Sequence, residues 1–385
     1  MKKLLSLALA CAMTLSLAAC GSSSSPGGQA SSGGQTPSNS AGTPNSSAGT
    51  SASEVKTPNV EDYLSGDYTK LPADGPTVNL TLGHAMQEAT DSHKMLLELK
   101  AALEKYSDGK ITMTIYPNGQ MGSDNEMIAS CLAGDIDLVY QSGATHATFV
   151  PETNIFDTPF LLAGYESAKI EEVLTNSEFR DIYNAANEEG GLVCLMLRAS
   201  GATYLTANKS VTSMVDLSGL KVRTAQSEAR MAVWRSLGAN PTPMSFNELY
   251  MALQNGTVEA QDNMLSNIVN SALFEVQDYL IPTKMATPAF DLTMNKDTFY
   301  ALPAEYQALL WEICEDLTSY DYALSNAMED VYYNQLLGEC GMTACEVSSE
   351  FLADMVEAVA PAIESAKQGV GNDALYDALD KLLNA

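Results

Sequence analysis

Arg223 is the residue of this sequence best suited to hold a small anion. It ends a short expected strand, Leu220 to Arg223, and precedes a polar turn, which is where a guanidinium would emerge into a cleft. A guanidinium donates two parallel hydrogen bonds to a carboxylate, which fixes orientation as well as charge. The sequence therefore predicts that Arg223 binds a carboxylate, against the alternative of a solvated arginine at a strand end.

The distribution of arginines supports this choice. All five lie between Arg180 and Arg235, although the 385-residue chain has a formal net charge of -28. Guanidinium groups stay positively charged and can donate two parallel hydrogen bonds to an anion. In this acidic protein they are thus concentrated in one stretch of the chain. We expect residues 219–263 to form one wall of a cleft for a small carboxylate.

Asn263, Gln226 and Phe246 are further candidates for this cleft. An asparagine can donate to a carboxylate or hydroxyl while accepting from a backbone amide, although a lone asparagine in a turn is often structural. Gln226 is a similar, weaker candidate. Phe246 could form the apolar wall of a pocket or act as a helix staple.

The elements around these residues explain how they could meet. Residues 76–86 and 111–115 alternate as strands and flank a helix at 90–106, which predicts a βαβ unit and a parallel sheet with its ligand edge at the strand C-termini. Residues 258–261 form a further strand that ends at Asp262 and Asn263. Parallel strands ending in Arg223 and Asn263 would present both side chains at one sheet edge.

Three more features of the chain bear on the architecture. The apolar run 191–197 suits a central strand, and 238–244 suits a stiff linker. Apolar residues spaced by three or four from Pro303 through Leu337 predict a helix of over thirty residues. Such a helix exceeds what one small lobe needs, so it could brace two lobes.

The N-terminus predicts export and lipidation. Residues 1–19 combine a short positive region with an apolar region too short to span a bilayer, and Leu-Ala-Ala-Cys follows at 17–20, which resembles a bacterial lipobox. Cys20 would then carry acyl chains and anchor the chain to the membrane; the alternative is an ordinary signal peptide. Residues 20–56 predict a disordered, Ser/Gly-rich tether.

Composition and missing motifs exclude several functions. The acidic balance argues against nucleic acid, and no phosphate loop, dinucleotide fingerprint, zinc-protease motif or nucleophile elbow is present. The histidines lack metal-ligand spacing, so no metal site, no cofactor and no catalytic residue is expected. Cys340 and Cys345 could pair or remain free thiols.

Several segments together resemble the solute-binding proteins of TRAP transporters, the tripartite ATP-independent periplasmic systems. The signature run lies at residues 219–223, 237–244, 248–256 and 259–263, with further matches at 106–111, 116–122 and 156–160. The similarity extends in order over about residues 77–385.

This resemblance implies an α/β, two-lobed periplasmic-binding-protein-like fold with two βαβ domains, a hinge and a long helix bracing both lobes. We expect residues 77–200 plus about 289–328 in lobe I, and 201–288 plus about 329–385 in lobe II. It also implies a non-enzymatic, extracytoplasmic and monomeric protein that delivers an organic acid to the TRAP membrane permease subunits.

The resemblance assigns ligand-binding roles to the matching residues. Arg223 would bind the ligand carboxylate, Asn263 would assist it, and Phe246 and Gln226 would shape the pocket. His84 and Gln141, which follow expected strands, and Thr203 are added as ligand-binding candidates. Many members carry a second arginine where this chain has Thr203, so a single carboxylate is predicted, with Lys284 or Arg230 as alternative sources of a second charge.

Two other functional classes stay open at this point. A secreted enzyme acting on a carboxylate would turn over candidate acids during incubation. An adhesive or sensory lipoprotein would show no shift in melting temperature with any small molecule.

Overall fold

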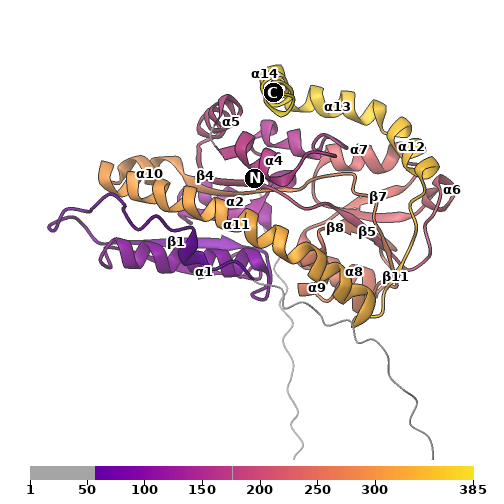
Figure 1. Ribbon diagram of the computed structural model, residues 1–385, viewed down its shortest axis with the longest axis horizontal. Helices are drawn as coiled ribbons and strands as arrows, with labels where there is room; N and C mark the ends of the chain where they lie inside the picture. The colour runs from indigo at the N-terminus through magenta and orange to yellow at the C-terminus, as the bar shows by residue number, and fades with distance from the viewer. Residues whose placement is uncertain (1–56, 176) are drawn as a thin grey trace, which may run out of the picture. The chain divides into compact units, whose positions relative to one another are not determined.

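The computed structural model describes residues 57–175 and 177–385, which lie in one compact unit. The predicted signal peptide, Cys20 and the tether to residue 56 lie outside the described residues. In the described chain, two mixed β-sheets are packed by helices and each sheet forms the centre of one lobe (Figure 1). The predicted two-lobed α/β architecture is confirmed.

The first sheet begins with the predicted strand–helix–strand unit. Its strand order is β2 (Ile111–Tyr116), β1 (Val78–His84), β3 (Leu138–Ser142), β10 (Ala289–Asn295) and β4 (Leu192–Ala199). β1 is parallel to β2 and β3, as predicted, whereas β10 is antiparallel to β3 and β4. The C-terminal ends of β1 and β3 therefore reach the same edge of the sheet, where loops and short helices begin.

The helices of this lobe cover the sheet and extend its edge. They are α1 (Asp91–Tyr106), α2 (Asp124–Ala133), α3 (Gly143–His146), α4 (Ser167–Thr175), α5 (Glu178–Glu189) and α10 (Lys296–Ala301), with 3-10 turns η1 (Val60–Asp62) and η2 (Pro151–Asp157). α1 begins where predicted, because the Thr90 side chain accepts a hydrogen bond from the backbone amide of His93.

The second sheet carries the predicted ligand-binding strands. Its strand order is β11 (Thr343–Ala344), β9 (Tyr279–Ile281), β5 (Tyr204–Ala207), β8 (Ala260–Asn263), β6 (Lys221–Thr224) and β7 (Asn240–Pro243). Its helical elements are α6 (Met214–Leu217), α7 (Glu228–Ser236), η3 (Phe246–Glu248), α8 (Leu249–Gln254), α9 (Leu265–Asn270), η4 (Leu273–Glu275) and α12 (Ser349–Ala358). β6 and β8 are parallel neighbours, so the two segments meet as predicted.

Two predicted elements differ in the structure. β4 is an edge strand rather than a central one, yet all its residues are buried because α4, α5 and α11 (Ala304–Gly338) pack on it. Residues 240–243 are not a linker but the edge strand β7, parallel to β6. An edge position tolerates the two prolines of β7, since a proline lacks the amide that an inner strand must donate.

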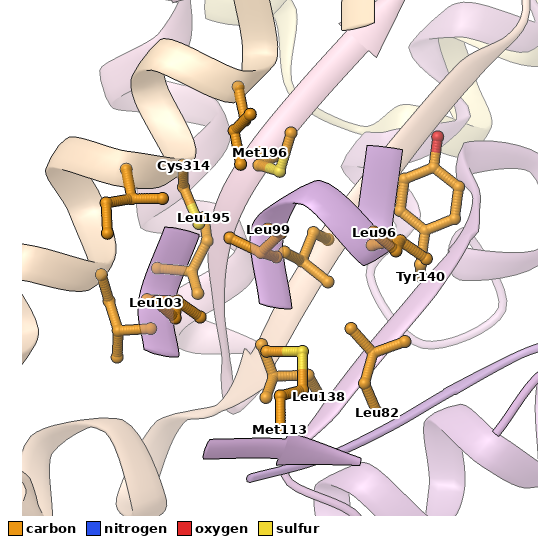
Figure 2. Packing of buried hydrophobic residues seen from close by; sticks show 14 of the residues in the cluster. Leu82, Leu96, Leu99, Leu103, Met113, Leu138, Tyr140, Leu195, Met196 and Cys314 are labelled. Atoms are coloured by element: carbon orange, nitrogen blue, oxygen red, sulfur yellow. The ribbon is translucent and has the colours of Figure 1, made fainter. Parts of the chain in front are cut away.

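The first lobe is held by one large apolar core. Figure 2 shows side chains from α1, three strands of the parallel unit, β4 and α11 pointing toward one another. Leu96, Leu99 and Leu103 lie on one face of α1 and are fully buried. A second apolar cluster beneath β6 and α7 contains Trp234 and forms the core of the other lobe.

The long helix α11 joins the two cores. Its 35 residues match the predicted span of over thirty. Leu309 and Leu317 are buried in the first-lobe core, whereas Tyr332 and Leu336 are buried beside α9 and β9 in the second lobe. The Tyr332 hydroxyl also donates to the Asp91 carboxylate of α1 at 2.6 Å. The predicted brace is confirmed.

The C-terminal helices correct the expected lobe boundary. α13 (Ala360–Val370) contacts η2 of the first lobe and α7 of the second. α14 (Asp373–Leu383) packs on α4 and α5, and its Leu375 and Leu379 join Phe179 in a first-lobe cluster. The end of the predicted lobe II range 329–385 therefore returns to the first lobe, because the apolar face of α14 finds its partners there.

Two further observations concern the cysteines and the possibility of a membrane-spanning helix. Cys340 and Cys345 are free thiols, as are Cys131, Cys194 and Cys314. Within the described ranges, no helix combines the length and the apolar character needed to cross a bilayer.

Candidate functional site

A cavity of about 70 Å³ lies between the two lobes. The first lobe contributes Met86, Asp124, Ser142, Ala144, Thr145, Pro288 and Phe290, and the second contributes Thr203, Arg223, Ala225, Arg230, Phe246, Asp262, Asn263 and Asn267. The predicted residues Arg223, Asn263, Phe246 and Thr203 are thus brought together in its wall. Polar groups converge there from both lobes, as in a site that closes on a small ligand.

Arg223 is a buried cation without an acidic partner. Its side chain is only 5 % exposed, and Nε and Nη2 both donate to the carbonyl oxygen of Met244, at 3.1 and 2.8 Å. In the described residues, no carboxylate forms a salt bridge with it and Nη1 has no hydrogen-bond acceptor. Burial lowers the pKa of Arg223 to about 10, while Asp262 and Asp124 raise it.

Local structure fixes Arg223 in this position. It lies next to the last residue of β6, opposite Gln261 of the parallel strand β8. Met244, whose carbonyl holds the guanidinium, directly follows β7 and precedes Ser245. The side chains of Ser245 and Glu248 form the predicted capping box, which fixes the backbone turn at this point.

Asn263 presents a donor to the cavity. Its Oδ1 already accepts from the backbone amide of Met264 at 3.2 Å and from Nδ2 of Asn267 at 2.7 Å. With the oxygen engaged in this way, the Nδ2 group is left to donate to a ligand. Asn263 ends β8, the strand next to the one that carries Arg223, and both side chains line the cavity.

Thr203 and Phe246 complete the wall around Arg223. The Thr203 hydroxyl is buried and has no hydrogen-bond partner in the described part of the chain. The guanidinium carbon of Arg223 lies 5.9 Å from the centre of the Phe246 ring, within the range of a cation–π contact. Phe246 therefore forms an apolar wall rather than a simple helix staple.

Asp124 faces the cavity from the first lobe. It is the first residue of α2 and is 7 % exposed. Burial raises the pKa of Asp124, and the nearby charge of Arg223 lowers it in part. No side chain among the described residues hydrogen-bonds to its carboxyl group. The cavity wall thus carries one buried guanidinium, that of Arg223, and one buried carboxyl group from the first lobe, that of Asp124.

Arg230 of α7, one of the two alternative sources of a second charge, is engaged by two carboxylates. Its Nε donates to Asp157 of η2 at 2.9 Å and its Nη1 donates to Asp262 of β8 at 2.7 Å. Burial would lower the pKa of Arg230, but the two carboxylates raise it. Ser227 also donates to Asp157, at 2.7 Å. Arg230 therefore links the lobes, and its charge is already neutralised.

The remaining predicted residues lie outside the cavity wall. Gln226 accepts a hydrogen bond from Asn125 of the first lobe at 2.8 Å, so it bridges the lobes beside the cavity. Gln141 is fully buried and donates to Thr293. Lys284 is exposed, lines another depression and lies 5.6 Å from the ring centre of Tyr204.

His84 supports the cavity from behind. Its Nδ1 accepts from the backbone amide of Met86 at 3.1 Å, so the proton is on Nε2, which contacts Nδ1 of His93 at 3.0 Å. Burial, followed by the charge of His93, lowers the pKa of His84 to about 3. His84 is therefore neutral at physiological pH and positions Met86, which lines the cavity.

Sequence reasoning missed several wall residues, notably Asp124, Asn267, Met86 and Phe290. Asp124 carried a usable signal, because it follows Ser123 in a capping box that starts a helix after a parallel strand. Phe290 carried none, because β10 reaches this edge from a distant part of the chain.

A family model for "Bacterial extracellular solute-binding protein, family 7" matches residues 82–368, which is most of the chain. The chain belongs to this family. Its members are extracytoplasmic solute-binding proteins and not enzymes, and the resemblance to TRAP solute-binding proteins is confirmed.

Relatives of the family are similar over most of their length. A solute-binding protein of Roseobacter denitrificans is 27% identical over 299 residues, covering 75% of this chain and 90% of the relative. The C4-dicarboxylate-binding periplasmic protein DctP of Vibrio cholerae is 27% identical over 281 residues, covering 73% and 83%. The sugar acid-binding protein of Advenella mimigardefordensis, solved with galactonate, is 26% identical with a TM-score of 0.75, covering 80% and 99%.

The Arg230→Gln substitution should destabilise the protein by about 3–5 kcal/mol, because it leaves two buried carboxylates unpaired. Arg235→Gln is the matched control. Within the described residues the one salt bridge of Arg235 is with Glu228, their side chains being 53% and 73% exposed, so its loss should cost less than about 1 kcal/mol. Urea unfolding of both variants provides the measurement, and equal losses would contradict the structural role of Arg230.

Proposed function

We propose that this chain captures a small organic acid with one carboxylate between its lobes and delivers it to the permease subunits of a TRAP transporter. The observation that carries the proposal is Arg223, a guanidinium buried at the interlobe cavity without an acidic partner in the described chain. A bound carboxylate would supply the missing charge and accept the free Nη1 hydrogen bond.

Three groups of the cavity wall support the proposal of one bound carboxylate. Arg223 offers charge and Nη1, Asn263 offers Nδ2, and Thr203 offers an unpartnered hydroxyl. All three belong to the second lobe and line the same cavity. A carboxylate has enough acceptor positions for these donors, so the ligand would satisfy polar groups that the protein leaves open.

The charge inventory favours a monocarboxylate. The cations of the cavity wall are Arg223 and Arg230, and Arg230 is committed to Asp157 and Asp262. The other proposed source, Lys284, is exposed and does not line the cavity. A second carboxylate would therefore be buried without a cation, which carries a desolvation cost of several kcal/mol.

Asp124 of the cavity wall favours a hydrogen-bond donor on the ligand. Its carboxyl group has no side-chain hydrogen-bond partner in the described ranges. A cavity of about 70 Å³ holds on the order of five waters. These features fit a compact hydroxy acid. Its hydroxyl would donate a hydrogen bond to Asp124, and its carboxylate would accept hydrogen bonds from Arg223.

The similar proteins support an acidic ligand and a transport role. One solved relative holds galactonate, and another relative is named for binding C4-dicarboxylates. This chain differs from the expected two-arginine pattern at Thr203, which is the reason to propose one carboxylate. Contacts from both lobes to the ligand would favour the closed state of the protein. We propose that the permease binds this closed form.

A melting-shift screen of small organic acids, followed by native mass spectrometry of the purified protein, would identify the ligand. With that acid, Arg223→Gln should weaken binding by roughly 2–5 kcal/mol, or about thirtyfold to several thousandfold. Calorimetry gives the affinities, and Arg235→Gln serves as the control for loss of an exposed arginine. A loss of less than about threefold would refute the assignment of Arg223.

Lactate and malonate test the monocarboxylate proposal, because they share a three-carbon skeleton and differ in the second polar group. We expect lactate to bind at least about tenfold more tightly, since the second carboxylate of malonate meets no free cation. Asp124→Asn should reduce the difference by removing an anion from the wall. Tighter binding of malonate to the wild-type protein would reject the proposal.

We also propose that acyl chains on Cys20 anchor the protein on the outer side of the cell membrane, with residues 21–56 as a tether. The support is the Leu-Ala-Ala-Cys sequence at 17–20 and the uncharged composition of the segment that follows. Cys20→Ser should move the protein from the membrane fraction to the soluble fraction. Retention in the membrane, with an unmodified Cys20 in mass spectra of the wild-type protein, would exclude the anchor.

A further inference from the structure

A second cavity, of about 230 Å³, lies within the first lobe. Residues of α4, α5, β4 and α11 form its walls, and it shares no lining residue with the interlobe cavity. It is therefore a separate space, and nothing in the proposed transport function requires it. Its wall contains Arg180, one of the five arginines.

Arg180 resembles Arg223 in being buried without an acidic partner. It is 7% exposed, and its Nη2 donates to the carbonyl oxygen of Cys194 at 2.8 Å. The accepting carbonyl belongs to the edge strand β4. Nη1 is buried and has no acceptor, and no salt bridge to Arg180 is formed in the described chain. The carbonyl of Cys194 accepts from one of the five N–H donors of the Arg180 guanidinium. Packing therefore does not explain why a positive charge is buried here.

Asp291, a buried carboxylate of the same lobe, is engaged by partners other than Arg180. Asp291 of β10 is fully buried, but its Oδ2 is held by His146 Nδ1 at 2.6 Å and by the Tyr183 hydroxyl at 2.9 Å. Asp291 forms no salt bridge with Arg180. Arg180 is thus left with the cavity as the place from which an anion could approach.

The other walls define what kind of anion would fit. Leu195, Leu197 and Trp311 give apolar surface. Asn184 lies one helical turn after Arg180 on α5, and its Oδ1, a hydrogen-bond acceptor, is buried without a partner among the described residues. Asp181 and Glu315 are exposed at the rim, where solvent screens their charge. An apolar body with a single carboxylate directed at Arg180 matches this arrangement.

We propose that this cavity is a second ligand site, which binds a small monocarboxylate with an aromatic or aliphatic body. The carboxylate accepts hydrogen bonds from the Arg180 guanidinium, and the body packs on Leu195, Leu197 and Trp311. This site is independent of Arg223 and lies inside one lobe, so it does not need lobe closure to form.

Fluorine NMR of 4-fluorobenzoate added to the full chain tests the proposal. We expect saturable line broadening with the wild-type protein and a much smaller effect with the neutral analogue 4-fluorobenzamide. Arg180→Gln should weaken 4-fluorobenzoate binding by at least about tenfold, since it removes the charged donor. Arg223→Gln should leave this binding unchanged, because it alters only the interlobe cavity.

A second variant keeps the arginine in place. Asn184→Asp puts a carboxylate four residues after Arg180 on the same helix face, so it should pair with the guanidinium and compete with the ligand. We expect it to weaken binding to a similar extent while the melting temperature is maintained. The proposal is overturned if 4-fluorobenzoate shows no saturable binding to the wild-type protein. It is also overturned if the Arg180→Gln and Asn184→Asp variants both bind with the affinity of the wild type, or if Arg223→Gln is the one variant that loses binding.

Discussion

The structure of the site depends on the burial of one guanidinium without a counter-charge. The protein has 48 acidic residues, yet none within the described chain forms a salt bridge with Arg223, whose pKa is lowered by burial. Burying an unpaired charge costs free energy, and the neighbouring carboxylates repay only part of it. A ligand carboxylate would supply the negative charge that Arg223 lacks. We therefore expect a bound acid to stabilise the arrangement in which the two lobes enclose it.

The neighbouring charged residues pair with one another, so the guanidinium of Arg223 stays available to bind a ligand carboxylate. Asp262 is close enough to affect its pKa, but this carboxylate is held by Arg230 at 2.7 Å. Arg230 also holds Asp157 of the first lobe, so the same residue occupies two acids and joins the lobes. The carbonyl of Met244 fixes the guanidinium without neutralising it. The helix α11 packs in the cores of both lobes and thereby holds the two walls of the interlobe cavity in position.

The elements with strong local patterns could be predicted from sequence, whereas features set by distant contacts could not. The βαβ unit, the capping box at Ser245 and the long helix follow from periodicity and caps, and parallel pairing then brings Arg223 and Asn263 together. β7 was missed because its prolines are acceptable only at a sheet edge. The role of Arg230 was missed because its partner Asp157 lies 73 residues earlier.

The most direct test of the central claim is a crystal structure of the protein with the acid that co-purifies with it. The account predicts a carboxylate within hydrogen-bond distance of Arg223 Nη1 and Asn263 Nδ2, with Arg230 still paired to Asp157 and Asp262. A ligand whose carboxylate contacts Arg230 instead, or that has no acidic group near Arg223, would contradict it.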